Sequence, residues 1–158
     1  MECIEKILCQ SLLEKGLKIA TAESCTGGMI AAKITSVSGA SGCFDAGVVT
    51  YSNEQKRKLL GVSKKTLKKH GAVSKETALE MCRGVRKLAK ADIGISVTGI
   101  AGPTGGTPEK PVGTVWIGVC SKESCKAERF LFDGNRDEVR EQTAVKALEL
   151  ANECVINK

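Results

Sequence analysis

Aromatic side chains are scarce in this sequence, at 3% of its 158 residues. One tryptophan, one tyrosine and three phenylalanines do not provide the series of stacking surfaces that proteins binding single-stranded nucleic acid use. Lysine and arginine outnumber aspartate and glutamate by 24 to 18, and much of the excess lies between Lys56 and Lys69. We interpret this excess as a solvated basic helical face. The composition suits anionic ligands, and we expect no nucleic-acid partner.

Long hydrophobic runs are also missing. The longest apolar runs, such as residues 112–120, are interrupted by glycine and are shorter than the roughly 20 residues that a membrane-spanning helix needs. The first six residues are acidic and amphipathic, unlike the basic start of a signal peptide. We therefore expect a cytoplasmic protein without a membrane partner, folded as a single domain over residues 1–158.

Metal-ligand patterns and a usable catalytic histidine are absent as well. No Cys-x-x-Cys pair occurs, and His70 is the only histidine, so a common zinc set would need ligands from distant segments. The eight cysteines are scattered, mostly among apolar neighbours, which predicts reduced thiols in the core. His70 ends a lysine-rich helical segment, where we expect it to terminate the helix rather than to act as a base. We expect no metal and no cofactor.

Hydrophobic periodicity changes repeatedly between helical and strand spacing along the chain. Helices are expected at residues 2–15, 29–34, 52–61, 75–90 and from 136 to about 155, with Ser52, Ser63 and Ser74 as helix caps. Strands are expected at residues 17–22, 46–51, 92–98, 113–121 and 126–132, the last two as a hairpin. This order predicts the α/β class, a three-layer α/β/α domain whose sheet is mixed and mostly parallel.

Three of the predicted strands are followed by residues that suit a binding site. Ser24, Tyr51 and Gly99 each lie at or just after the end of a strand. Ligands of open α/β sheets bind beyond the carboxyl ends of the strands. Three separate segments therefore converge on one predicted site.

Ser24 lies in the run Ala-Glu-Ser-Cys-Thr-Gly-Gly, residues 22–28, at a strand-to-helix turn. It could cap the helix, with Thr26 as another available cap, or it could be a nucleophile whose oxyanion is stabilised by backbone N–H groups. The run is not a Gly-x-Ser-x-Gly elbow, because Ala22 occupies the first glycine position. Cys25 is a competing nucleophile, since a thiol at a helix N-terminus has a lowered pKa, although we favour its packing as a small apolar residue, as the other cysteines are expected to do.

A lysine is the better base for an activated serine, because the only histidine is unsuitable. Lys56 lies in the first turns of the helix that follows Tyr51. A lysine accepts a proton only when it is neutral, so its pKa must be lowered by desolvation or by nearby positive charge, which Arg57 and Lys58 could supply. Tyr51 could relay the proton or orient the amine. The alternatives are an exposed helix lysine and an ordinary aromatic residue at a strand end.

Two further features could bind a phosphate. The loop at residues 99–106, which includes Gly99 and Gly102, is rich enough in glycine for backbone N–H groups to approach an anion, but it lacks the ending of a P-loop and could simply be flexible. Arg136 and Arg140 lie four residues apart and share a helix face. They could hold a phosphate together or pair with neighbouring acidic side chains.

Four segments taken in order resemble the CinA C-terminal domain family. They are residues 21–28, 49–54, 70–74 and 99–103, the last followed by 110–115, and the resemblance extends from about residue 17 to residue 144. The family includes nicotinamide mononucleotide deamidases. The resemblance implies hydrolysis of the carboxamide of nicotinamide mononucleotide to nicotinic acid mononucleotide and ammonia, in pyridine-nucleotide salvage and without a metal.

Site residues carry over by position in these motifs. Ser24 matches the nucleophile, Tyr51 and Lys56 match its activating residues, and residues 134–137 match the arginine-bearing segment, which leaves Arg136 and Arg140 as alternatives. The substrate would be held by the turn after Ser24 and by the glycine loop and arginines: Cys25, Thr26, Gly27, Gly28, Gly99, Gly102, Arg136 and Arg140.

The same resemblance implies self-association into a homo-oligomer, whereas the pyrophosphatase-type domain of larger CinA proteins has no counterpart in this sequence. A rival prediction from another functional class is a nucleotide-binding or regulatory module without turnover, linked to competence or DNA repair.

Overall fold

The computed structural model describes residues 1–158, which fold around one five-stranded sheet. The strands are β1 (Ile19–Glu23), β2 (Phe44–Val49), β3 (Ile93–Gly99), β4 (Thr114–Cys120) and β5 (Cys125–Leu131), in the spatial order β2-β1-β3-β4-β5. β2, β1 and β3 run parallel, while β4 and β5 join as an antiparallel hairpin beside β3. The predicted mixed sheet is confirmed. Its parallel part consists of β2, β1 and β3, and β2 is one of its two edge strands.

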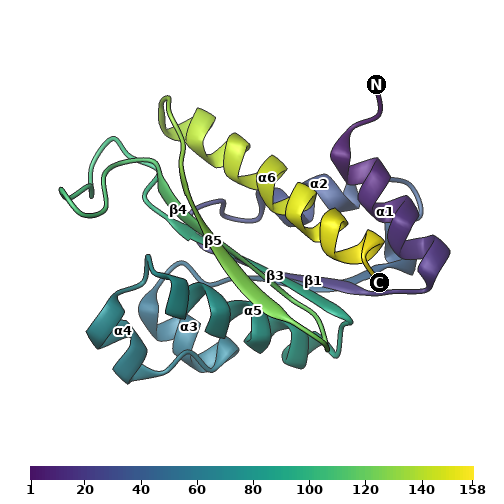
Figure 1. Ribbon diagram of the computed structural model, residues 1–158, viewed down its shortest axis with the longest axis horizontal. Helices are drawn as coiled ribbons and strands as arrows, with labels where there is room; N and C mark the ends of the chain where they lie inside the picture. Colours follow the sequence, from purple (N-terminus) through teal and green to yellow (C-terminus); the bar gives the residue numbers. More distant parts are fainter.

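Helices cover both faces of the sheet, which confirms the three layers (Figure 1). One face carries α1 (Ile4–Lys15), α2 (Met29–Thr35) and α6 (Arg136–Ile156), and the other carries α3 (Asn53–Leu60), α4 (Lys64–His70) and α5 (Lys75–Ala89). A single 3₁₀ turn, η1 (Ala40–Gly42), precedes β2. No helix combines the length and the apolar composition that crossing a membrane requires.

Local capping sets the starts of most helices. The hydroxyls of Ser52, Ser63 and Ser74 accept hydrogen bonds from the third residue of the helix that each begins, as predicted. Asn135 forms a complete capping box with Glu138 at the start of α6. His70 is the last residue of α4, as expected.

The strand predicted at residues 46–51 is shifted, because β2 spans Phe44–Val49. Its register with β1 runs from Phe44 opposite Ile19 to Val49 opposite Glu23, so β2 ends where β1 ends. Tyr51 therefore lies in the connection to α3 rather than in the strand.

The two sides of the sheet bury cores of different size. A cluster of 22 buried residues fills the side of α1, α2 and α6, whereas only 7 fill the side of α3 and α5. Leu60 and Met81 belong to the smaller core. Lys56, the candidate base, is a buried residue of α3 and lies on the side of the sheet with the smaller core.

The expectation that all eight cysteines are reduced core thiols is wrong. Cys120 and Cys125 form a disulfide, and Cys3 is exposed. The two bonded residues are directly opposite each other in the β4–β5 hairpin. Their pairing depends on the register of the hairpin, which the spacing of the cysteines along the chain does not reveal.

Candidate active site

The carboxyl ends of β1, β2 and β3 meet at one edge of the sheet and surround a cavity of about 220 Å³. It brings together six of the predicted site residues, Ser24, Cys25, Tyr51, Lys56, Gly99 and, from α6, Arg136. Its remaining walls come from Asn53, Ala72, Val73, Thr98 and Ala101. The convergence expected from strand order is therefore present in the structure.

Lys56 points inward from α3 and is only 1% exposed. Its Nζ lies 3.0 Å from Ser24 Oγ and donates a second hydrogen bond, of 2.7 Å, to the Thr50 carbonyl oxygen. Both partners are neutral oxygens, so neither holds the ammonium form as a carboxylate would. Burial lowers the pKa of Lys56, and only a charged Cys25 thiolate would oppose that change.

Desolvation, rather than neighbouring positive charge, explains this lowered pKa. Arg57 and Lys58 are exposed, and the Lys58 ammonium pairs with Glu54 at 2.8 Å on the outer side of α3. Water and this carboxylate screen their charges from the interior. Of the two causes considered from the sequence, the structure therefore supports burial.

Ser24 does not cap the following helix, so that alternative is wrong. α2 begins at Met29, and its N-cap is Gly28, with a φ of 106° and no side-chain cap. The Ser24 N–H donates to Val97 O, which ties the turn to β3. The N–H groups of Cys25 and Thr26 donate to no protein acceptor. Cys25 lines the cavity, so its N–H is free to bind an oxyanion that forms beside Ser24, whereas the N–H of Thr26 is buried away from the cavity.

Glu23 performs the capping that the serine does not. Its carboxylate, 1% exposed, accepts hydrogen bonds from Ile30 N at 2.8 Å, Ala31 N at 3.0 Å and Thr26 Oγ1 at 2.6 Å. Thr26 is thereby fully buried and does not line the cavity. Sequence reasoning missed Glu23, because its contacts lie up to eight residues further along the chain, outside the usual capping pattern.

The two arginines of α6 have separate contacts. Arg140 donates from Nε to Cys25 O at 2.9 Å and from Nη2 to Thr26 O at 3.1 Å, so it supports the turn from behind. Arg136 lines the cavity and donates to Gly102 O at 2.8 Å and to Tyr51 Oη at 2.9 Å. Arg136 is thus the arginine that a ligand in the cavity can reach.

Tyr51 lies at the mouth of the cavity and is 64% exposed. Its hydroxyl accepts the hydrogen bond from Arg136, while Lys56 uses Thr50 O instead. The structure therefore groups Tyr51 with the arginine rather than with the lysine.

Gly27 and Gly28 lie in the turn between β1 and α2. Their φ values are 60° and 106°, in the left-handed region that favours glycine.

Two polar residues of the cavity were missed from the sequence. Asn53 is the first residue of α3, directly after the cap, and Thr98 precedes Gly99 at the end of β3. The Thr98 hydroxyl donates to Ala72 O at 2.8 Å and so holds the α4–α5 connection against the sheet. Position at a strand end was the available signal for Thr98.

Cys25 does not have the lowered pKa expected of a thiol at a helix N-terminus. It is 6% exposed, and burial raises its pKa to about 11, despite opposing contributions that include Arg140. A thiol with this pKa is protonated near neutral pH. Cys25 is therefore a poor rival to Ser24 as nucleophile.

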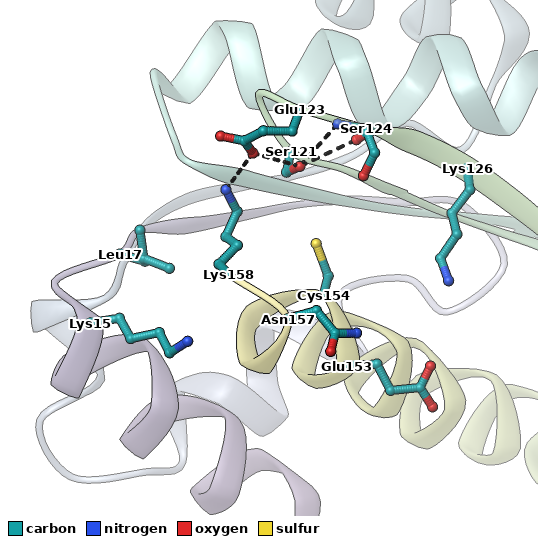
Figure 2. A pocket seen from close by; sticks show the side chains of 10 residues that line it. All are labelled: Lys15, Leu17, Ser121, Glu123, Ser124, Lys126, Glu153, Cys154, Asn157 and Lys158. Atoms are coloured by element: carbon teal, nitrogen blue, oxygen red, sulfur yellow. Dashed lines mark hydrogen bonds and ion pairs between the residues drawn. The ribbon is translucent and has the colours of Figure 1, made fainter.

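Figure 2 shows a larger cavity, of about 820 Å³, near the opposite edge of the sheet. It is formed by the C-terminal ends of α1 and α6 and by the β4–β5 turn, and Lys158 pairs there with Glu123 at 2.6 Å. None of the residues around Ser24 lines it. No group of three or more His, Cys, Asp or Glu side chains is placed to hold a metal ion. Chemistry rather than volume therefore identifies the smaller cavity as the candidate site.

Comparisons with known sequences agree with the motifs. The profile of the family described as CinA C-terminal domain matches residues 1–155. A CinA-like protein of Citrifermentans bemidjiense is 56% identical over 138 residues, which cover 87% of this chain and 33% of the relative. A CinA-like protein of Kosmotoga olearia is 49% identical over 155 residues, covering 98% of this chain and 38% of the relative. The chain thus spans between a third and two fifths of the length of these curated relatives.

Solved structures show the same fold over nearly the whole chain. The competence/damage inducible protein CihA from Agrobacterium tumefaciens superposes with a TM-score of 0.91 at 40% identity, covering 98% of this chain and 96% of that one. A CinA superfamily protein from Klebsiella pneumoniae superposes with a TM-score of 0.94 at 36% identity, covering 98% and 97%. The chain belongs to the CinA C-terminal domain family.

Proposed function

We propose that this chain is a serine amidohydrolase that converts nicotinamide mononucleotide to nicotinic acid mononucleotide and ammonia. One observation carries the proposal. The amine of the buried Lys56 lies 3.0 Å from Ser24 Oγ, within reach for proton transfer, and burial lowers its pKa. A neutral amine beside a serine hydroxyl is a nucleophile–base pair that needs no histidine. The nicotinamide nucleotide as substrate follows from the family resemblance.

In the proposed acylation step, Lys56 takes the Ser24 proton while Oγ bonds to the carboxamide carbon. The carbonyl oxygen becomes an oxyanion that can accept a hydrogen bond from the free N–H group of Cys25. Lys56 then returns the proton to the amide nitrogen, the C–N bond breaks, and ammonia leaves. The positive pyridinium ring makes the carbonyl more electrophilic and further disfavours a charged Lys56.

Deacylation uses the same groups. Water attacks the ester carbon while Lys56 accepts a water proton, and a second oxyanion forms at the same N–H group of Cys25. The bond to Ser24 Oγ then breaks and Oγ recovers its proton from Lys56. The carboxylic acid that forms loses its remaining proton to solvent and leaves as the carboxylate. One lysine acts as base and acid in turn, which is possible because its pKa is lowered toward neutrality.

Arg136 is the proposed phosphate ligand. It lines the cavity mouth with Tyr51, and a guanidinium binds phosphate well because of its planar set of donors. A cavity of about 220 Å³ has room for the ring and its carboxamide, so the ribose phosphate would extend over Arg136, Gly99 and Gly102. Arg140, which is engaged with the turn, would support the oxyanion site indirectly.

Ammonia release from nicotinamide mononucleotide tests this function. We expect turnover by the wild type, a loss of about 10³-fold or more in Ser24→Ala and Lys56→Ala, and retained turnover in Cys25→Ala. Lys58→Ala, which removes an exposed lysine of the same helix, is the matched control and should remain active. Undiminished turnover by Ser24→Ala would overturn the proposed nucleophile, and loss in Cys25→Ala alone would transfer the role by one residue.

A second candidate function is a nucleotide-binding or regulatory module without turnover. It is favoured by the name of the Agrobacterium tumefaciens neighbour, a competence/damage inducible protein. A ligand-dependent rise in the unfolding temperature without ammonia release would support it.

The proposed location of the protein is the cytoplasm. The proposed assembly is a homo-oligomer, and light scattering can measure its mass.

A further inference from the structure

A second cleft, of about 330 Å³, lies beside the candidate active site. Its lining includes residues of α4 and α5, the helices that lie on the same side of the sheet as α3 in Figure 1. The only tryptophan of the chain, Trp116 on β4, and the only histidine, His70 at the end of α4, both line it. Trp116 is half-buried. A cleft of this size falls within the range of small-ligand sites, and an accessible indole offers a flat surface for an aromatic ring.

The sheet register connects this cleft to the active site. Thr98 is paired with Trp116, and Trp116 with Arg129, so the three side chains stand in one row on the same face of β3, β4 and β5. Thr98 lines the active-site cavity, whereas Trp116 and Arg129 line the cleft. Val73 lines both. The α4–α5 connection is therefore a shared wall between two neighbouring sites.

Positive charge gathers around the indole. Lys110 Nζ donates to His70 O at 2.8 Å, and Arg129 Nη2 donates to Glu109 O at 3.0 Å. These acceptors are backbone carbonyl oxygens, which orient the two cations without neutralising them. Lys75 is a third cation of the lining.

The cleft also contains two carboxylates, which reduce but do not cancel this charge. Glu76 lies 3.6 Å from His70 Nδ1, and Glu109 is exposed. Three permanent cations therefore face two carboxylates, one of which is beside an imidazole. The balance suits a ligand that carries negative charge.

We propose that this cleft binds a nucleoside monophosphate. The base lies against the Trp116 indole, and the phosphate lies among Lys75, Lys110 and Arg129. Stacking on an indole selects a planar ring, and the cations select an anion attached to it. The site is separate from Ser24 and does not depend on the proposed amidohydrolase activity.

Tryptophan fluorescence provides a direct test, because the chain has a single tryptophan. The full chain is titrated with adenosine 5′-monophosphate while the Trp116 emission is recorded. We expect saturable quenching by this probe, no quenching by ribose 5-phosphate, which lacks the ring, and binding about tenfold weaker for adenosine, which lacks the phosphate. Isothermal titration calorimetry on the same samples supplies a second measure of affinity.

Matched variants locate the bound probe. Arg129→Gln should weaken binding about tenfold or more, whereas Lys126→Gln removes the same charge from the opposite face of the same strand and should not. Arg136→Gln, in the active-site cavity, should leave the affinity unchanged within about twofold. Thermal unfolding of each variant confirms that it is folded.

Several outcomes would overturn the proposal. No saturable signal at millimolar probe excludes a useful site, and equal binding of ribose 5-phosphate excludes stacking. A loss in Arg136→Gln without a loss in Arg129→Gln would place the probe in the active-site cavity. Binding of single-stranded oligodeoxyadenylate far tighter, per nucleotide, than the monophosphate would show a nucleic-acid surface instead.

Discussion

A lysine side chain that is 1% exposed needs a physical explanation, since the charged form loses its hydration on burial. Lys56 has two acceptors, Ser24 Oγ and Thr50 O, which suffice for a neutral amine. No carboxylate accompanies them to compensate a full charge. The contacts of this residue therefore favour a lysine whose pKa lies below its ordinary value of 10.5.

The pH dependence of activity follows from this lowered pKa. If neutral Lys56 is the base, the logarithm of kcat/KM for ammonia release should rise with pH at a slope of one. It should level off above an apparent pKa that lies below 10.5. Lys56→Arg should have a kcat/KM about 10³-fold or more below that of the wild type at every pH, because a guanidinium keeps its proton. Steady-state rates across the pH range measure both. A wild-type kcat/KM that falls as the pH is raised toward that apparent pKa would contradict the assignment of Lys56 as the base.

The lowered pKa of Lys56 also predicts a stability difference whose sign can be worked out. Between the lowered folded pKa and the unfolded value near 10.5, the unfolded chain binds a proton that the folded chain has lost. The free energy of unfolding of the wild type should therefore rise with pH, relative to Lys56→Met, by about 1.4 kcal/mol for each pH unit within that interval. Urea unfolding of both proteins at a series of pH values measures the difference. A constant difference would show that burial does not perturb Lys56.

At the scale of elements, the β1–α2 connection is the most constrained part of the site. The Ser24 N–H donates to Val97 O of β3, Glu23 at the end of β1 accepts from the first turn of α2, and Arg140 of α6 donates to Cys25 O. Contacts to β3, α2 and α6 thus fix the turn that carries the Cys25 N–H. Preorganised donors of this kind stabilise an oxyanion without rearrangement during the reaction.

Removing the charge of Glu23 should loosen this connection. Glu23→Gln places an amide N–H₂ where the carboxylate accepts backbone hydrogen bonds, so the free energy of unfolding should fall by about 2 kcal/mol. The control is Glu54→Gln, whose exposed ion pair with Lys58 contributes about 0.5 kcal/mol or less. Urea unfolding of the two variants distinguishes them, and equal effects would contradict the capping role of Glu23.

Local elements were predictable where their causes are local. The hydroxyls of Ser52, Ser63 and Ser74 act within three residues, so their helices begin where the sequence predicts. The end of β2 depends on its pairing with β1, and the strand was accordingly misplaced by two residues. The Cys120–Cys125 disulfide depends on hairpin register and was missed for the same reason.

For the molecule as a whole, charge is divided between the two helical layers. Residues 52–92, which include α3, α4 and α5, carry twelve lysines and arginines against four aspartates and glutamates, so the rest of the chain is slightly acidic. Ion pairs within this part are few, namely Lys58 with Glu54 and His70 with Glu76. Mutual repulsion among the exposed cations should therefore destabilise the folded chain at low ionic strength.

Salt should relieve this repulsion. Raising sodium chloride from about 0.01 M to about 0.15 M shortens the Debye length from about 30 Å to about 8 Å, and we expect the free energy of unfolding to rise by on the order of 1 kcal/mol. Lys65→Glu should reduce that gain, whereas Lys122→Glu, in the β4–β5 turn, should not. Denaturant titrations at the two salt concentrations measure it. A decrease in stability with salt would show that attraction, not repulsion, dominates the surface.

Short-range patterns in the sequence were enough to predict the α/β class, most helix starts and the position of Ser24, Tyr51 and Gly99 at or after strand ends. Capping and hydrophobic periodicity act over a few neighbouring residues, which makes these features local. Motifs indicated Ser24 and Lys56 but left the cap, the cysteine and the two arginines as alternatives. Only the tertiary structure separated these alternatives. Which of eighteen lysines is desolvated, and which arginine faces the cavity, depends on contacts such as that between Lys56 and Ser24, 32 residues apart, and on the helix face that packing turns toward the sheet.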